Sequence, residues 1–369
     1  MIYTIKKKLQ LLFKKFTYGL FKLFYGEIKE YEDIGNKSNS SIKISKFDKD
    51  YAYKVYSVKA ARLYTDTIND TSIIQNNKII NGPSFQIRNV KFENIKHNVV
   101  FTKGTPRLKR KLNGNLFSLL TGGGGNYNYW HWMFDVLPRI KILSNVIDIN
   151  KIDNYLFPNL EKNYQKQSLD ILKIPTEKRL SSLKLRHIEC KEIFVTDHPY
   201  VIKNQASEEI QNMPMWIINW IREKLTQNLE YSMQEKLPKK IYIDRGDATS
   251  NQSAMRKIIN EDEVQDKLNS LGFESIKLGN ISLENQIKIF QNADSIIGLH
   301  GGGFANIVFC KPNTKILELK SKSAGNVITN LAKKCNLKYE TISKTPEKLN
   351  QNNQLGFIRV EVNEILKKL

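Results

Sequence analysis

The sequence predicts an α/β protein with two domains, of which the second is built on a parallel sheet. The chain has 369 residues, a length sufficient for two domains of ordinary size with separate cores. Its apolar content of 40% and aromatic content of 10% are typical of globular proteins. After residue 240, short apolar runs alternate with helical stretches, an order that produces a parallel sheet covered by helices.

The regular half of the chain follows a polar stretch, 227–240, which we interpret as the domain boundary. The predicted strands cover 240–243, 273–278, 295–299, 314–319 and 338–342, and the predicted helices cover 261–271, 282–293 and 326–335. In a parallel sheet of this kind, ligands bind at the carboxyl ends of the strands. The residues that we expect at those ends are Asp244, Arg245, His300, Gly301, Gly302 and Glu318.

The stretch 294–319 is the most informative part of this half. Its apolar run ends in His300 and three glycines, and Phe304 to Phe309 then predicts the start of a helix. Glycines allow backbone N–H groups to approach a phosphate, and a helix N-terminus favours negative charge. Glu318 ends the next predicted strand and is expected to accept hydrogen bonds from ribose hydroxyls. From spacing alone, the glycines equally fit a simple turn, and His300 a structural hydrogen bond.

Two arginines border the polar loop that follows the first strand of this half. Arg245 comes directly after the strand, and Arg256 lies at the far end of the loop. A guanidinium group binds a diphosphate through paired hydrogen bonds, so both arginines are candidate phosphate ligands. Solvent exposure without a ligand is the alternative for Arg256.

The stretch 121–140 carries the second group of polar residues. Gly122 to Gly125 predict a loop, and a helix is predicted from about Tyr127 to Leu137. His131 and Asp135 are four residues apart and therefore lie on one face of this helix, which Asn128 extends by a turn. The rest of the helix is largely apolar. A buried histidine and carboxylate must bind each other or a ligand, and the spacing leaves both possibilities open.

Residues 5–25 predict a basic amphipathic helix, because apolar residues recur every three or four positions between lysines. Such a helix either lies on a membrane surface or packs on the domain core. Further strands are predicted over 55–63, 84–87, 98–101, 155–157 and 192–195, with helices over 164–172 and 216–225. We expect four segments: the helix (1–26), a first α/β domain (27–230), a second domain (231–345) and a tail (346–369).

Composition limits the classes of function. The 58 Lys and Arg residues outnumber the 37 Asp and Glu residues, and the net charge of +21 attracts anions. This charge is spread along the chain and no nucleic-acid-binding motif is present, so we do not expect a nucleic acid partner. Three cysteines without a CxxC motif predict a reducing compartment and no structural zinc.

Four motifs together resemble the glycosyltransferase family 61 domain. They are N-x-x-H-W-x-x-D-x-L-P-R (Asn128–Arg139), R-x-x-x-N-E (Arg256–Glu261), Q-I-x-x-F-x-x-A-D (Gln286–Asp294) and G-x-H-G-G-G-x-x-N-x-x-F-x-x-P-x-x-x-x-x-E-L (Gly298–Leu319). The bacterial members with which the chain is compared are capsule or surface-polysaccharide proteins. The chain departs from the family at two points: Gly302 replaces the usual alanine, and Asp244-Arg245 replaces the usual arginine pair.

The resemblance implies a GT-B-like architecture, in which two Rossmann-like domains face a cleft. It also implies the inverting transfer of a sugar from a nucleotide-sugar donor to a glycan or lipid-linked glycan acceptor. Asp135 is the predicted base, with His131 orienting it or acting in its place. The predicted donor-binding residues are Arg245, Arg256, His300, Gly301, Gly302, Gly303, Asn306 and Glu318.

The sequence contains no recognisable cluster of metal ligands, so we expect cations and backbone dipoles to take the place of a divalent ion, and no cofactor. The family resemblance places the protein in the cytoplasm, at the inner face of the cytoplasmic membrane, where residues 5–25 would contact the lipid surface. Two alternatives remain, a catalytically inactive binding protein with the same fold and a basic nucleic-acid-binding protein.

Overall fold

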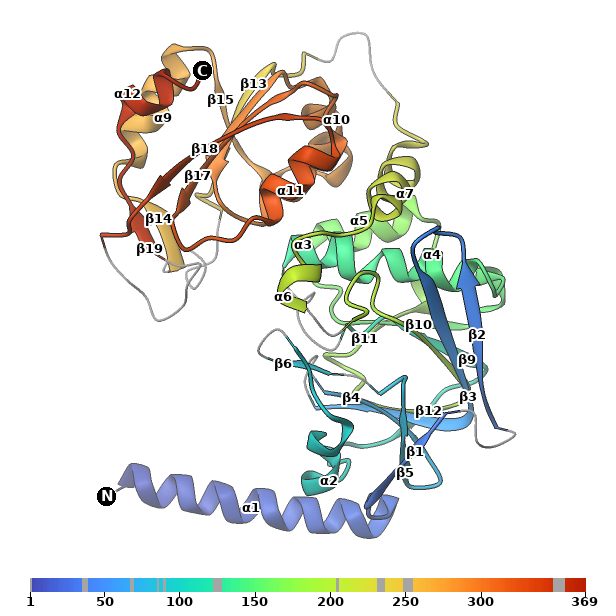
Figure 1. Ribbon diagram of the computed structural model, residues 1–369. Helices are drawn as coiled ribbons and strands as arrows, with labels where there is room; N and C mark the ends of the chain where they lie inside the picture. The colour runs from blue at the N-terminus through green and yellow to red at the C-terminus, as the bar shows by residue number, and fades with distance from the viewer. Residues whose placement is uncertain are drawn as a thin grey trace. The chain divides into compact units, whose positions relative to one another are not determined.

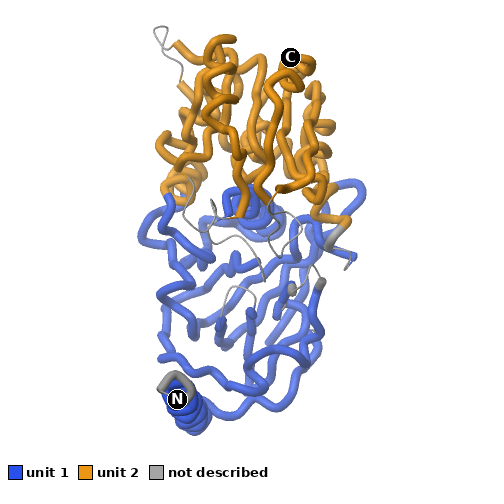
Figure 2. The backbone as a smooth tube through the Cα atoms, turned by 90° about the vertical axis from the view of Figure 1, so that its left-hand side faces the viewer, with its two compact units in different colours: residues 1–162, 174–207 blue, residues 163–173, 208–369 orange. Residues whose placement is uncertain are grey.

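The structure is a computed structural model, which describes residues 2–34, 39–66, 70–84, 86–88, 91–121, 128–203, 206–230, 236–247, 255–347 and 356–369 (Figure 1). The chain divides into two compact units (Figure 2). Unit 1 contains residues 1–162 and 174–207, and unit 2 contains residues 163–173 and 208–369. The sequence-based boundary lies later, at residue 230. That boundary would put helix α7 (Met215–Thr226) in the first domain. In the structure α7 belongs to unit 2, where the Arg222 side chain donates a hydrogen bond to the Val308 carbonyl.

Unit 1 is built on a mixed sheet. Its strands are β1 (Glu30–Asp33), β2 (Ser40–Lys46), β3 (Ala52–Thr65), β4 (Thr71–Gln75), β5 (Lys78–Asn81), β6 (Ile87–Arg88), β7 (Lys91–Phe92), β8 (Arg110–Lys111), β9 (Asn115–Ser118), β10 (Asn154–Phe157), β11 (Arg179–Ser181) and β12 (His187–Thr196). Its helices are α1 (Ile2–Tyr25), η1 (Ile95–His97), α2 (Val100–Lys103), α3 (Tyr129–His131), η2 (Trp132–Val136), α4 (Pro138–Ser144), η3 (Ile149–Lys151) and η4 (Thr176–Lys178), while α6 (Ala206–Glu209) crosses into unit 2.

The strands of the main sheet in unit 1 follow the order β1-β5-β4-β3-β12-β9-β10-β11. The long strand β3 pairs antiparallel with β2, β4 and β12, whereas β12, β9, β10 and β11 pair with one another in parallel. Helix α4 packs against β3 and β12, and Ser45 of the neighbouring strand β2 donates a hydrogen bond to the Ile142 carbonyl of α4. Unit 1 thus combines parallel pairing of β12, β9, β10 and β11 with antiparallel pairing around β3, which the sequence did not predict.

One predicted strand of unit 1 is wrong. Residues 98–101 were expected to be extended, but Val100–Lys103 forms the short helix α2. The Asn98 side chain accepts hydrogen bonds from the Val100 backbone N–H, at 3.2 Å, and from the Ser72 hydroxyl, at 2.9 Å. Asparagine side chains that bind the backbone two residues further on favour turns over strands, which explains the difference.

Unit 2 contains a separate parallel sheet. Its strands are β13 (Lys240–Asp244), β14 (Arg256–Ile258), β15 (Glu274–Lys277), β16 (Ser295–Leu299), β17 (Lys315–Ser321), β18 (Lys338–Lys344) and β19 (Gly356–Ile358). Its helices are α5 (Asn163–Ile171), α7, α9 (Glu261–Ser270), η5 (Leu278–Asn280), α10 (Leu283–Asn292), η6 (Gly302–Phe309), α11 (Val327–Lys334) and α12 (Val362–Leu366).

The main sheet of unit 2 has the strand order β15-β13-β16-β17-β18, and all of its pairs are parallel, which confirms the predicted parallel sheet. Helices α9 and α12 lie on one face of this sheet, and α10 and α11 lie on the other (Figure 1). The central strand β16 is entirely buried, as expected for a strand covered on both faces. The chain leaves β13 and β16 in opposite directions, so a ligand-binding crevice is expected at their carboxyl ends.

Candidate functional site

The polar residues of the first stretch lie on one continuous helical segment of unit 1, made of α3, η2 and α4. Asn128 caps its start, because the side chain accepts a hydrogen bond from the Trp130 N–H at 3.0 Å. The segment runs on to Ser144, so the predicted end at Leu137 is wrong. Element η2 is a π-helical turn, in which the Leu137 N–H donates to the Trp132 carbonyl at 3.1 Å. The wider turn accommodates Pro138, whose ring would clash with a carbonyl in a regular helix. The predicted glycine loop, 122–125, and Tyr127 lie outside the described residues.

Asp135 lies in this π-helical turn and is the centre of a buried polar cluster. Its Oδ2 atom accepts a hydrogen bond from His131 Nδ1 at 2.8 Å, as the four-residue spacing predicted. The Tyr200 hydroxyl donates a hydrogen bond to the other oxygen, Oδ1. His198 Nε2 lies 3.6 Å from Oδ2. Both oxygens of the carboxylate are therefore occupied by side chains of the protein.

His198 and Tyr200 follow the end of β12 and were not predicted as site residues. The Nδ1 atom of His198 accepts hydrogen bonds from the backbone N–H groups of Tyr200, at 3.3 Å, and Val201, at 3.1 Å. Its proton is consequently on Nε2, directed at Asp135. Burial lowers the pKa of His198, which favours the neutral form of the ring.

Arg139 connects the helix to the end of β12. Its side chain is fully buried, and it donates to the carbonyl oxygens of Asp135 and Thr196, each at 3.1 Å. Burial lowers the pKa of this guanidinium to about 10, which still leaves it charged at neutral pH. Arg139 thus fixes the position of the Asp135 backbone.

The electrostatic balance of the cluster keeps Asp135 ionised. Burial alone would raise the pKa of this carboxyl, but the charge and hydrogen bond of His131, with a further contribution from His198, lower it well below its usual value. Burial also acts against the charged form of His131, yet the Asp135 carboxylate raises the pKa of the imidazole above 6.5. A carboxylate held in this way is a weak base, whereas the imidazole paired with it becomes a stronger one.

The two members of this pair differ in their exposure. The His131 side chain retains 27% of its accessible surface, compared with 4% for Asp135. Because Nδ1 is bound to Asp135, the second ring nitrogen, Nε2, is the atom left to meet a ligand. The cluster can therefore orient one imidazole and take up a proton on it.

A second imidazole–carboxylate pair lies in unit 2, at the predicted glycine unit. His300 Nδ1 is hydrogen-bonded to Glu318 Oε1, and the Tyr339 hydroxyl donates to Oε2. Lys320 Nζ lies 3.7 Å from the same oxygen. Glu318 has no exposed side-chain surface, and His300 retains 7%. The Glu318 carboxylate is thus buried and occupied by side chains of unit 2, and its contact with a ribose stays a prediction.

Arg245 and Arg256 meet at the start of the glycine loop. Both donate through Nη1 to the His300 carbonyl oxygen, Arg245 at 3.2 Å and Arg256 at 2.8 Å. A Cβ atom at position 301 would lie closer to Arg245 Nη1 than van der Waals contact allows, so Gly301 leaves room for the guanidinium group in this position. Burial, followed by the charge of Arg245, lowers the pKa of Arg256 to about 10. No carboxylate of the described residues pairs with either guanidinium within 4 Å, so the two positive charges remain available to an anion.

The other residues predicted to bind a donor, Asn306, Gly302 and Gly303, belong to η6. Asn306 is fully buried in η6 and donates to the Gln286 side chain at 2.9 Å, which makes it part of the core. Gly302 and Gly303 begin η6, where a Cβ atom at Gly303 would approach Leu278 to 3.0 Å. The structure thus brings together Arg245, Arg256, His300 and Gly301, whereas the Asn306 side chain is buried against Gln286.

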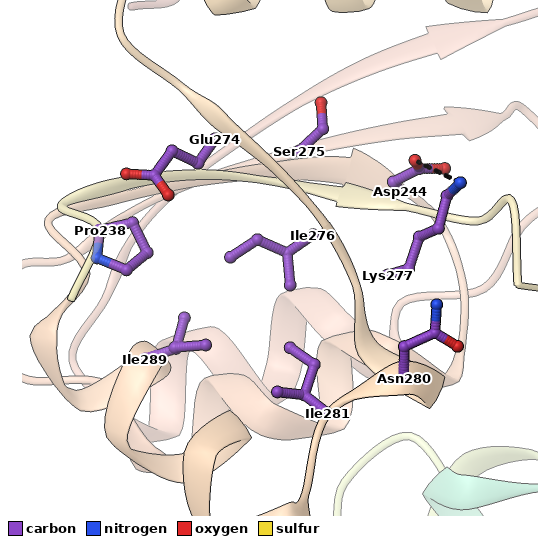
Figure 3. A pocket seen from close by; sticks show the side chains of 9 residues that line it. All are labelled: Pro238, Asp244, Glu274, Ser275, Ile276, Lys277, Asn280, Ile281 and Ile289. Atoms are coloured by element: carbon purple, nitrogen blue, oxygen red, sulfur yellow. Dashed lines mark ion pairs between the residues drawn. The ribbon is translucent and has the colours of Figure 1, made fainter. Parts of the chain in front are cut away.

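A cavity of unit 2 lies elsewhere, along the edge strand β15 and helix α10 (Figure 3). It measures about 480 Å³ and contains the Asp244–Lys277 ion pair, whose atoms are 3.9 Å apart. Neither Arg245, Arg256 nor the glycine loop lines this cavity, so it is not part of the candidate donor site. Within the described ranges, no cluster of three or more His, Cys, Asp or Glu side chains has the geometry of a metal site.

Comparison with known families matches residues 129–317 to a family model described as Glycosyltransferase 61. The matched range includes His131, Asp135 and His300, and it ends one residue before Glu318. A search of curated proteins finds no match for the chain.

Proposed function

The chain belongs to the glycosyltransferase 61 family, and from this premise we propose that it transfers a sugar from a nucleotide-sugar donor to a hydroxyl group of a surface-polysaccharide or other glycan acceptor, with inversion. Membership of the family supports the glycosyltransferase activity itself. The donor, the acceptor class and the inversion belong to the proposal, as does a GT-B arrangement of the two units. The proposed location is the cytoplasmic face of a membrane.

The observation that carries the mechanism is the hydrogen bond between His131 and the buried, ionised Asp135. In the proposed reaction His131 Nε2 takes the proton from the acceptor hydroxyl as its oxygen attacks the anomeric carbon. Asp135 orients the ring and stabilises the resulting imidazolium. The bond from the anomeric carbon to the diphosphate breaks, and the electron pair leaves with the nucleotide.

Arg245 and Arg256 are assigned to the leaving diphosphate. Two guanidinium groups without a carboxylate partner among the described residues supply positive charge where negative charge develops, the role that a divalent ion has in other enzymes. Gly301 permits this approach, and the Glu318–His300 pair holds the carbonyl to which both arginines donate. Glu318 is therefore a positioning residue in this proposal.

The test is a screen of nucleotide sugars with the full-length protein. Thermal shifts identify the bound donor, since a ligand raises the melting temperature by mass action, and NMR of the product then gives its anomeric configuration. Asp135→Asn should bind the same nucleotide and lose transfer, while the exposed Asp266→Asn serves as the control. Retention of the donor's configuration, or full activity of Asp135→Asn, would contradict the mechanism.

A further inference from the structure

Helix α1 presents an apolar face that no described residue of unit 1 covers. The exposed fractions are 71% for Phe13, 69% for Phe16, 85% for Leu23 and 70% for Phe24. At 3.6 residues per turn these side chains fall within about a third of the helix circumference. The alternative that the sequence left open, a helix packed on the domain core through this face, therefore does not apply to the structure.

The helix is attached to unit 1 by its opposite side. The half-buried residues in its second half are Thr17, Tyr18, Phe21, Lys22 and Tyr25. The Tyr25 ring stands edge-on to His187, with 4.9 Å between ring centroids, and its hydroxyl accepts a hydrogen bond from the Lys109 N–H at 3.1 Å. This attachment turns the apolar face outward. Within the described residues, no carboxylate lies within 4 Å of the lysines flanking that face, Lys7, Lys8, Lys14 and Lys15.

A basic cavity of about 600 Å³ adjoins the end of α1. Four cationic side chains line it, Arg62, Lys109, Lys111 and Lys191, against one carboxylate, Glu189. Lys109 pairs with Glu189, and Arg62 donates to the Tyr25 carbonyl at 2.9 Å. Lys111 and Lys191 are exposed, and no described carboxylate pairs with them. The cavity is therefore positively charged and has a size suited to a small anionic group.

One lining residue of this cavity has a strained backbone, Ala60, whose φ angle is 48°. The positive φ angles of Asn76 and Asn77 (47° and 57°) belong to the two-residue turn between β4 and β5, where asparagine adopts them readily. An alanine in this region costs about 1 kcal/mol or more, and such strain concentrates at functional sites. In β3, Ala60 lies opposite Lys191, between the register pairs Lys59 with Glu192 and Ala61 with Cys190, without an extra residue on either strand.

Phe24 belongs to both features, since it ends the apolar face of α1 and lines the cavity. We propose that this continuous surface docks on a bilayer that contains anionic phospholipid, with the apolar face of α1 inserted at the interface and a lipid phosphate bound between Lys111 and Lys191. The partner follows from complementarity: the face offers apolar side chains bordered by lysines, and the adjoining cavity offers cations. This inference rests on the proposed membrane location, and it identifies anionic phospholipid as the component of the membrane that the protein binds.

Vesicle sedimentation with the full-length protein tests the inference. We expect binding to phosphatidylcholine vesicles containing 30% phosphatidylglycerol and little binding to phosphatidylcholine alone. Lys111→Gln with Lys191→Gln should weaken binding by about 30-fold, from the contribution of two lysines near an anionic surface. Lys43→Gln with Lys184→Gln removes the same charge elsewhere on unit 1 and should change binding by less than about twofold. Phe13→Ala with Phe16→Ala keeps the helix and should weaken binding at least about tenfold.

Several outcomes would overturn the inference. Equal losses in the two lysine pairs would show general charge attraction without a pocket. Inorganic phosphate should compete with vesicle binding of the wild type more than with that of the Lys111/Lys191 variant, and equal competition would remove the phosphate site. A dimer in light scattering that Phe13→Ala with Phe16→Ala dissociates would assign the apolar face to a second copy. Nucleotide-induced thermal shifts should be unchanged in all of these variants, which separates this inference from the transfer reaction.

Discussion

The two units each contain a histidine paired through Nδ1 with a carboxylate whose other oxygen accepts a tyrosine hydroxyl. In unit 1 the set is His131, Asp135 and Tyr200, and in unit 2 it is His300, Glu318 and Tyr339. The third neighbour differs. His198, which burial keeps neutral, lies beside Asp135, whereas a lysine, Lys320, lies beside Glu318.

The neighbours of the two histidine–carboxylate pairs indicate that the pairs have different roles. The charge of Glu318 is balanced within the core, and His300 is nearly buried at 7% exposure, so the pair organises the loop that positions Arg245 and Arg256. The charge of Asp135 is balanced mainly by His131, which remains 27% exposed. A partly exposed imidazole that is bound to a buried carboxylate can exchange a proton with a substrate, and a buried one serves as a structural support.

The largest expected effect is the loss of the exposed imidazole. His131→Ala should lower kcat by about 10²–10⁴-fold, the usual contribution of a general base, and leave the Kd for the nucleotide nearly unchanged. Steady-state kinetics and thermal shifts measure the two quantities. The control is His97→Ala, which removes a histidine that is also bound to a carboxylate four residues away, Glu93, but lies on the surface. A kcat for His131→Ala equal to that of the control would exclude the base role.

The second effect concerns the stability of unit 2. Glu318→Gln removes the negative charge beside buried Lys320, and removing one member of a buried ion pair costs about 3–5 kcal/mol. Denaturant unfolding measures the change in free energy. Glu340→Gln breaks the exposed pair with Lys368 and should cost less than about 1 kcal/mol. Equal, small losses in both variants would mean that Glu318 is not an ionised support.

The third effect concerns donor affinity. Arg256→Ala removes one of the two guanidinium groups at the glycine loop, and a hydrogen bond to a charged group contributes about 1.5–3 kcal/mol, so the Kd for the nucleotide should rise about 10–100-fold. Titration calorimetry gives this constant. Arg359→Ala, at an exposed arginine paired with Glu347, should leave it unchanged. An unaltered Kd for Arg256→Ala would remove this arginine from the donor site.

The fourth effect is a pH dependence that follows from His131. A general base acts in its deprotonated form, so kcat/KM should rise about tenfold per pH unit until the pH exceeds the pKa of His131. Asp135 raises that pKa, which puts the bend above 6.5, the value for a free imidazole. In Asp135→Asn the opposing effect of burial remains, so the bend of any residual activity should move to lower pH. A bend at the same pH in both proteins would mean that the ionisation of His131 does not control kcat/KM.

The sequence was sufficient for the local parts of these sites. The four-residue spacing of His131 and Asp135 and the succession of strand, glycines and helix start at His300 are both encoded within one short stretch. The parallel sheet of unit 2 was predictable for the same reason, since each strand and its following helix are adjacent in the chain. The π-helical turn was not predicted, although Pro138 within an apolar helical pattern is the signal for it.

The long-range parts were not accessible from the sequence. Tyr200 reaches Asp135 across 65 residues, and only the position of β12 beside the helical segment brings them together. The orientation of Glu318 was inferred from its place at the end of a predicted strand, 314–319. Strand β17 in fact continues to Ser321, which places Glu318 inside the sheet, opposite Gly298 and Thr341. The sequence pattern located Glu318 on this strand, and the burial of its carboxylate follows from the two additional residues of the strand.

The smallest expected effect compares the two tyrosines directly. Tyr200→Phe leaves an oxygen of buried Asp135 without a donor, so the free energy of unfolding should fall by about 1 kcal/mol or somewhat more. Tyr339 is only half-buried, and Lys320 lies 3.7 Å from the oxygen that its hydroxyl binds. Tyr339→Phe should therefore cost less, because the lysine can take over the freed oxygen. Only Tyr200→Phe should also lower kcat, since it loosens the carboxylate that orients His131. A kcat loss of similar size in both variants would mean that both histidine–carboxylate pairs contribute to catalysis to a similar extent.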